Sequence, residues 1–111
     1  MTMKDDDAVI VAIARTPIGR ARKGGLTSVR GDELARQTLS AVLAMVPGFA
    51  IEDIDDLMLG TAGPEGEQGF NMARVVATLL GHDGLPGTTV NRFCASSIQT
   101  TRMAFHAIRV R

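Results

Sequence analysis

The chain has 111 residues, of which 45% are hydrophobic, and its 12 basic residues balance its 12 acidic ones. This composition predicts a single folded domain, and the neutral balance argues against binding to nucleic acid or to a membrane surface. No apolar run reaches the roughly 18 residues that a membrane span needs. The acidic residues 1–7 are not a secretory signal, and we expect them to be disordered. A single cysteine excludes an internal disulfide, so we predict a cytoplasmic protein.

Three apolar segments have the length of strands, within residues 8–14, 54–60 and 87–93. The first, Ala8–Ala14, is continuously apolar and β-branched, which is typical of a central strand covered on both faces. Helices are predicted from Gly31 to about Val46, after the glycine-rich loop 61–69, and from Cys94 onward. This alternation predicts an α/β fold with a parallel sheet of about three strands. Because the last helical pattern meets no stop before Arg111, we expect a truncated piece of a longer protein.

Cys94 is the candidate catalytic residue, because it lies where the third strand is predicted to turn into the third helix. The free N–H groups and the dipole at a helix start place about half a positive charge there. That charge favours a thiolate over a thiol, and the thiolate is the nucleophilic form. The alternative is a buried core cysteine, which is the common role of a lone cysteine. Position alone does not decide between these two interpretations.

Other polar residues have simpler interpretations. Asn91, Ser96 and Ser97 suit turns and helix caps, and Ser97 could cap a helix that starts late. The segment Gly19–Gly25 lacks the Lys-Ser/Thr pair of a phosphate-binding loop, so its basic residues are predicted to lie in a solvated loop. His82 and His106 are predicted to be structural or exposed, and no metal site is predicted.

Three motifs, in order, resemble those of thiolases. They are Arg15-Thr16-Pro17-Ile18-Gly19, the strand Leu57–Gly60 with Gln68–Arg74 after it, and Thr89-Val90-Asn91-Arg92-Phe93-Cys94-Ala95-Ser96-Ser97. The third is similar to the thiolase nucleophile motif, although Ala95–Ser97 replace glycines found in many members. The resemblance implies that residues 1–111 are the N-terminal part of a thiolase N-terminal domain. The whole family fold has five layers and two similar halves.

The resemblance also implies an acyltransferase in which Cys94 carries an acyl group as a thioester. The acyl group would come from a 3-ketoacyl-CoA or from acetyl-CoA, with coenzyme A as co-substrate and no covalently bound cofactor. Members of the family are dimers or tetramers. Their sites are completed by a second cysteine and histidines from the C-terminal part, which this sequence does not contain. We therefore expect the isolated chain to be inactive.

Two alternatives stay open at this stage. The first is a condensing enzyme of the ketoacyl synthase type, which shares the fold and the nucleophilic cysteine, although Arg15-Thr16-Pro17 fits thiolases better. The second is a non-catalytic half-domain that associates with itself or with another polypeptide. An incomplete sheet leaves an open edge and an uncovered face, and both favour association.

Overall fold

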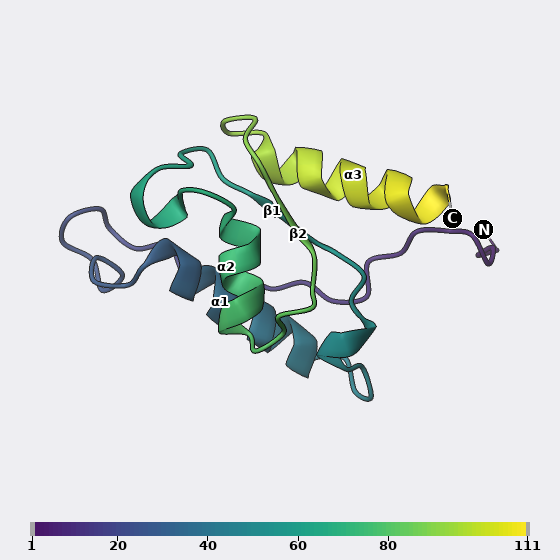
Figure 1. The fold of residues 1–111 in the computed structure, drawn as a ribbon. Helices are drawn as coiled ribbons and strands as arrows, with labels where there is room; N and C mark the ends of the chain where they lie inside the picture. Colours follow the sequence, from purple (N-terminus) through teal and green to yellow (C-terminus); the bar gives the residue numbers. More distant parts are fainter. Residues whose placement is uncertain (1, 111) are drawn as a thin grey trace.

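The computed structural model describes residues 2–110 and has three layers (Figure 1). A two-stranded sheet lies in the middle, with one helix packed on each face and a further helix packed against one of these two. In chain order the helices and strands are α1 (Gly31–Ala44), β1 (Leu57–Gly60), α2 (Met72–Leu79), β2 (Gly87–Val90) and α3 (Ser96–Arg109). Two short 3-10 helices, Ile51–Asp53 and Gly66–Gln68, lie in the connections on either side of β1.

The two strands run parallel, with Leu57 opposite Gly87 and Gly60 opposite Val90. Parallel neighbours need a crossover connection, and α2 supplies it. The predicted α/β class, with a small parallel sheet and alternating helices, is confirmed. Both strands point their carboxyl ends toward the start of α3, so this register fixes where the chain turns into that helix.

The predicted strand Ala8–Ala14 is wrong for this structure, because these residues join no ladder and the sheet of the described chain has two strands instead of about three. Ile10, Val11 and Ile13 are more than three-quarters exposed. A strand requires a hydrogen-bonding neighbour, and a run that is apolar on both faces requires cover on both. The described residues give this segment neither of them.

The core is centred on α2, whose inner face is buried against the sheet. Its fully buried side chains, together with one from the following loop, are Met72, Ala73, Val76, Ala77 and Leu85. Val75 and Leu79 of the same helix are exposed, at 42% and 46%. The apolar side chains of α1, such as Leu34 and Leu39, are only half-buried. Both α1 and α2 therefore keep hydrophobic surface in contact with water.

Asn71 is the N-cap of α2 and holds the start of this helix against β2. Its Oδ1 accepts from the Arg74 N–H at 3.4 Å, and its Nδ2 donates to the Gly87 carbonyl at 2.7 Å. The Thr89 hydroxyl donates to the same Oδ1 at 2.8 Å and accepts from the Ala73 N–H at 3.0 Å. These bonds satisfy helix-start donors and join α2 to the strand that leads to Cys94.

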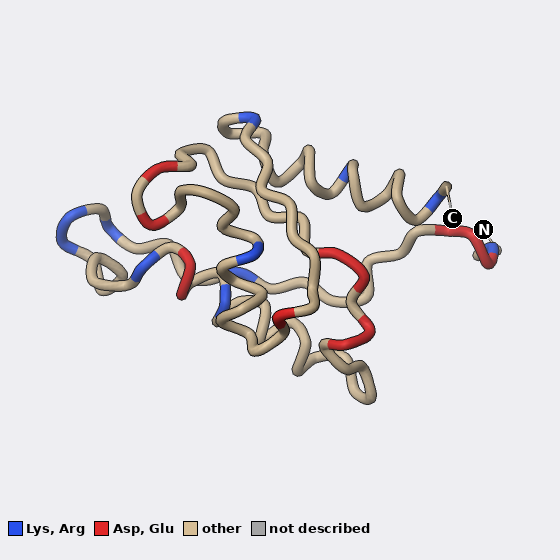
Figure 2. Tube along the Cα trace, in the orientation of Figure 1, with Lys and Arg blue, Asp and Glu red and all other residues tan. Residues whose placement is uncertain are grey.

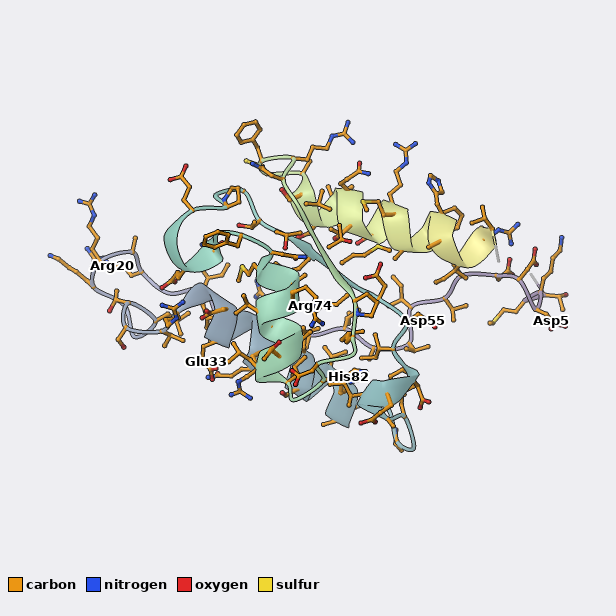
Figure 3. All side chains as sticks on the ribbon, in the orientation of Figure 1. Asp5, Arg20, Glu33, Asp55, Arg74 and His82 are labelled. Carbon is orange, nitrogen blue, oxygen red and sulfur yellow. The ribbon has the colours of Figure 1, made fainter. Side chains whose placement is uncertain are left out.

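Arg74 secures the loop that leads from α2 into β2 (Figure 3). Its guanidinium donates to the Asp83 carbonyl at 2.9 Å and to the Leu85 carbonyl. Hydrogen bonds from a charged donor are stronger than neutral ones. The strand therefore enters the sheet from a fixed point.

The start of α1 is held by charged side chains from two parts of the chain. Arg30 is the N-cap but provides no side-chain cap, and Glu67 instead accepts from the Gly31 N–H at 2.6 Å. The buried Asp32 pairs with Arg30 at 2.8 Å, and this hydrogen bond lowers the pKa of Asp32 below its ordinary value. Before this helix, Arg20, Arg22 and Lys23 lie in an exposed basic loop, as predicted (Figure 2).

Candidate active site

A turn joins the carboxyl end of β2 to α3 (Figure 1). Cys94 lies in this turn and is exposed. The predicted position at a strand-to-helix junction is confirmed, and the alternative of a buried core cysteine is wrong. The helix begins later than predicted, at Ser96 with Ala95 as N-cap, so Cys94 precedes the helix by two residues. The sulfur is accessible and lies next to the amino end of a helix.

The turn depends on an unusual backbone conformation at Phe93. This residue has φ of +48°, in the left-handed region that non-glycine residues rarely occupy, and its side chain is 74% exposed. The Asn91 Oδ1 accepts from the Phe93 N–H at 2.9 Å, and the Ala95 N–H donates to the Arg92 carbonyl at 3.0 Å. These two bonds fold the chain sharply immediately before and after Cys94. The prediction of turn chemistry for Asn91 is confirmed.

Ser96 provides the main side-chain anchor of this turn. It is 4% exposed, and its Oγ accepts from the Arg92 N–H at 2.8 Å. The same Oγ lies 2.7 Å from the Phe93 carbonyl and 3.2 Å from the carbonyl of Thr61. Turn chemistry is therefore confirmed for Ser96, but the suggested capping role of Ser97 is wrong. The Ser97 side chain is exposed, and its carbonyl accepts from the hydroxyls of Thr100 and Thr101.

Gly60 permits the close approach of β1 to the start of α3. A methyl group at this position would lie 2.7 Å from the Ser96 carbonyl carbon and 2.8 Å from the Ser97 nitrogen. Both atoms belong to the backbone, so neither can move aside without shifting the helix. The sequence suggested only that Gly60 ends a strand. Its contact with a helix 36 residues later follows from the fold and leaves no local signal.

The start of α3 presents uncompensated positive character next to Cys94. No acidic residue lies in the first turn of the helix. Arg92, in the preceding turn, donates from its guanidinium to the Gln99 Oε1 at 2.5 Å, so a cation is tied to this helix. A helix start of this kind favours negative charge in a group placed nearby.

Within residues 2–110, both histidines lie far from the turn that carries Cys94. His82 lies before the amino end of β2, whereas Cys94 follows the carboxyl end of the same strand (Figure 3). The length of the strand alone is roughly 13 Å. His106 lies ten residues along α3 from Ser96, or about 15 Å. At these distances neither histidine is within hydrogen-bond reach of the sulfur. Within residues 2–110, no cluster of three or more His, Cys, Asp or Glu could hold a metal ion.

Two grooves of the described chain lie beside the sheet and the far half of α3. One of about 370 Å³ follows the free edge of β1, between α1 and the Ser97–Thr100 turn of α3. Another, of about 700 Å³, lies beside Ala104, Ala107 and Ile108, away from the start of the helix. Among residues 2–110, no helix has both the length and the apolar character that crossing a membrane requires.

Known proteins are similar to this chain over most of its length. The family described as "Thiolase, N-terminal domain" matches residues 8–111. A 3-ketoacyl-CoA thiolase of Bacillus subtilis (strain 168) is 45% identical over 103 residues, covering 92% of this chain and 26% of that protein. A protein of the same name from Alcanivorax borkumensis is 38% identical, and the match covers 97% of this chain and 28% of that protein. Another, from Saccharophagus degradans, is 40% identical, and the match covers 94% of this chain and 27% of that protein.

The chain belongs to the thiolase family, a family of acyltransferase enzymes. It matches the N-terminal domain of that family and spans about a quarter of the length of the curated relatives. The resemblance seen in the three sequence motifs is therefore confirmed. The names of these relatives favour a thiolase over a condensing enzyme of the ketoacyl synthase type.

Proposed function

We propose that Cys94 is the acyl-accepting nucleophile of a thiolase-type acyltransferase that acts on 3-ketoacyl-CoA or acetyl-CoA. The single observation that carries this proposal is an exposed thiol in a fixed turn at the amino end of a helix. The family match supports it, because the relatives are named 3-ketoacyl-CoA thiolases. We further propose that the chain works in the cytoplasm, in β-oxidation of fatty acids and as part of a homo-oligomer.

The residues indicate how such a reaction would proceed. In thiolysis, the Cys94 thiol gives its proton to a base of the complete enzyme, and its sulfur bonds to the ketone carbon of a 3-ketoacyl-CoA. The bond from that carbon to the α-carbon then breaks. The electron pair stays on the α-carbon, which takes a proton and leaves as acetyl-CoA. The thiol of coenzyme A then loses its proton to a base and replaces the Cys94 sulfur on the acyl group. In condensation these steps run in reverse, starting from two acetyl-CoA molecules.

We also propose that the isolated chain of 111 residues does not turn over substrate. Proton transfers at the α-carbon and at the CoA thiol need positioned acid–base groups, each worth roughly 10²–10⁴-fold in rate. The two histidines of the chain lie about 13 Å or more from the turn that carries Cys94. Cleavage of 3-ketoacyl-CoA by the purified chain, at a rate near that of a complete thiolase, would contradict this proposal.

A chimeric enzyme tests the nucleophile directly. Residues 8–111 would replace the aligned segment of the Bacillus subtilis thiolase, which is 45% identical and supplies the remaining three-quarters of the protein. We expect the chimera to cleave 3-ketoacyl-CoA. Cys94→Ala in the same chimera should lower kcat by more than about 10³-fold, because a nucleophile that forms a covalent bond has no substitute.

Two controls make the result decisive. Ser97→Ala removes a neighbouring exposed hydroxyl and should leave the rate unchanged. Matching substrates linked to a carrier protein should react poorly, whereas a preference for them would favour the ketoacyl synthase alternative. A chimera with the parent's circular dichroism spectrum that keeps its activity without Cys94 would refute the proposal.

A further inference from the structure

Ser96 has a buried hydroxyl whose role the proposed function leaves unexplained. Its side chain is the most deeply buried polar group in the turn that carries Cys94. A hydroxyl has one proton to donate and two lone pairs to accept with. Here one lone pair accepts from the Arg92 N–H at 2.8 Å, and the proton can go to the Phe93 carbonyl at 2.7 Å or to the Thr61 carbonyl at 3.2 Å.

Ser96 and its partners lie on both sides of Cys94 in the chain and include a residue that follows the other strand. Arg92 and Phe93 precede the cysteine, whereas Ser96 follows it as the first residue of α3. Thr61 lies 35 residues earlier, directly after β1, and its own N–H donates to the Val90 carbonyl at 3.0 Å. The hydroxyl therefore joins the two sides of the turn that carries Cys94. It also connects this turn to Thr61, which is hydrogen-bonded to the end of β2.

The close packing at Gly60 leaves this arrangement little freedom. A methyl group there would lie 3.0 Å from the Ser96 Cβ and nearer still to the backbone of the first helical turn. Phe93, in contrast, has a left-handed backbone conformation, which it would leave if the surrounding hydrogen bonds were lost. The hydroxyl of Ser96 contacts the carbonyl of this same residue.

We infer that Ser96 is a positioning residue, which fixes the direction of the Cys94 thiol relative to the start of α3 through its buried hydroxyl. This inference rests on the proposed nucleophilic role of Cys94. Without the hydroxyl, the Arg92 N–H loses its acceptor and the turn can relax away from the helix start. The thiolate would then lose part of its stabilisation, while the sheet and helices remain in place.

The test uses the full chain and follows alkylation of Cys94 by iodoacetamide, by mass spectrometry, across a range of pH. Each rate is compared with that of the same chain unfolded in urea, where no helix start exists. We expect the folded wild-type chain to react faster than the unfolded one at neutral pH. Ser96→Ala should lower this acceleration by up to about tenfold, which is what one lost hydrogen bond corresponds to, and should move the pH profile toward that of the unfolded chain.

Two comparisons separate positioning from folding. Ser97→Ala removes an exposed hydroxyl one residue away and should keep the wild-type profile. Ser96→Thr and Ser96→Val have the same shape and differ in the hydroxyl, so Thr should keep more of the acceleration than Val. Every variant is measured in sucrose, which favours the compact state, and is compared with the wild-type circular dichroism spectrum. If Ser96→Ala does not fold, the Thr and Val pair decides.

The outcomes distinguish this inference from the proposed function. If the folded wild-type chain is alkylated faster than the unfolded one, and Ser96→Ala and Ser96→Val keep the same pH profile, the role of Ser96 is overturned. The proposed role of Cys94 then stands. A wild-type chain that reacts no faster than its unfolded form counts against an activated Cys94, and the positioning role fails with it. A loss confined to the variants without the hydroxyl supports both.

Discussion

At the scale of single residues, the turn that presents Cys94 stores conformational strain. A left-handed backbone costs an ordinary residue about 1–2 kcal/mol, and Phe93 recovers little by burial because its ring is exposed. The bonds from Asn91 and Ser96 offset this cost. Such strain is typical of sites where a side chain must point in one direction.

Glu33 makes stability depend on pH at the start of α1. Its carboxylate accepts from Arg36 at 2.6 and 2.7 Å and from Gln37 at 2.8 Å, and these bonds lower its pKa from 4.5 to about 2. Between these values the unfolded chain binds more protons than the folded one. The contribution of Glu33 is therefore fully present above about pH 4.5 and is lost as the pH falls through about 2.

We predict that Glu33→Gln flattens the fall of unfolding free energy between pH 5 and pH 2, which is roughly the interval of this linkage. The measurement is urea unfolding followed by far-UV circular dichroism, since the chain has no Trp or Tyr for fluorescence. The hydrogen bond with Arg30 also lowers the pKa of Asp32, so the unfolding free energy of Glu33→Gln should still fall with decreasing pH, but less steeply. Glu52→Gln, in the 3-10 helix Ile51–Asp53, is the control and should keep the wild-type slope. Equal slopes for wild type and Glu33→Gln would contradict this prediction.

The sequence predicted the position of Cys94 because strand and helix patterns meet there. It did not predict Phe93 as a left-handed residue, because nothing in an exposed phenylalanine signals that conformation. It also did not choose between Ser96 and Ser97. That choice depends on the contact with Thr61, which only the fold brings near.

At the scale of elements, the site depends on how closely β1 and α3 approach. Gly60 allows that approach, and Gly63, three residues later, has no atom within 4 Å of where a methyl group would lie. The two glycines therefore form a matched pair. One lies in a tight backbone contact, whereas the other lies in open space.

We predict that Gly60→Ala lowers the unfolding free energy by about 1–3 kcal/mol, because the new methyl group meets backbone atoms that cannot move aside. Gly63→Ala should be neutral or stabilising by up to about 1 kcal/mol, since it reduces the freedom of the unfolded chain. Urea unfolding of both variants gives the comparison. A Gly60→Ala variant as stable as Gly63→Ala would show that the contact is not tight in solution.

The helices and the two strands of the sheet were predictable, because their periodicity and their ends are local properties. Asn71 marks the start of α2 by a side-chain bond within one turn, and the sequence shows such a cap directly. The segment Ala8–Ala14 shows the limit of this reasoning. Its apolar pattern indicates an environment covered on both faces, but a pattern cannot provide the neighbouring strand.

At the scale of the whole molecule, much hydrophobic surface remains uncovered. Ile10, Val11 and Ile13 are largely exposed in the N-terminal segment, and Ile98 and Phe105 are exposed on α3. The free edge of β1 adjoins a groove lined by apolar side chains such as Leu34 and Leu39 of α1. Open edges and apolar patches of this kind favour association with other chains.

We therefore predict that the purified chain self-associates. Light scattering coupled to size-exclusion chromatography should give a mass that rises with concentration. The double variant Ile10→Lys with Ile13→Lys should shift the chain toward the monomer. Ile18→Lys, at an exposed site outside the apolar run, should not. A compact monomer at every concentration would contradict this account of the uncovered surface.

The most direct test of the central claim is to isolate the acyl thioester on Cys94. The chimera with the Bacillus subtilis thiolase would be mixed with a 3-ketoacyl-CoA in the absence of free coenzyme A and digested with trypsin. The peptide Phe93–Arg102 contains Cys94 and no other cysteine. We predict that mass spectrometry finds one acyl group on this peptide and that added coenzyme A removes it. An unmodified Cys94 in a chimera that still cleaves substrate, or an acyl group on another residue, would contradict the claim.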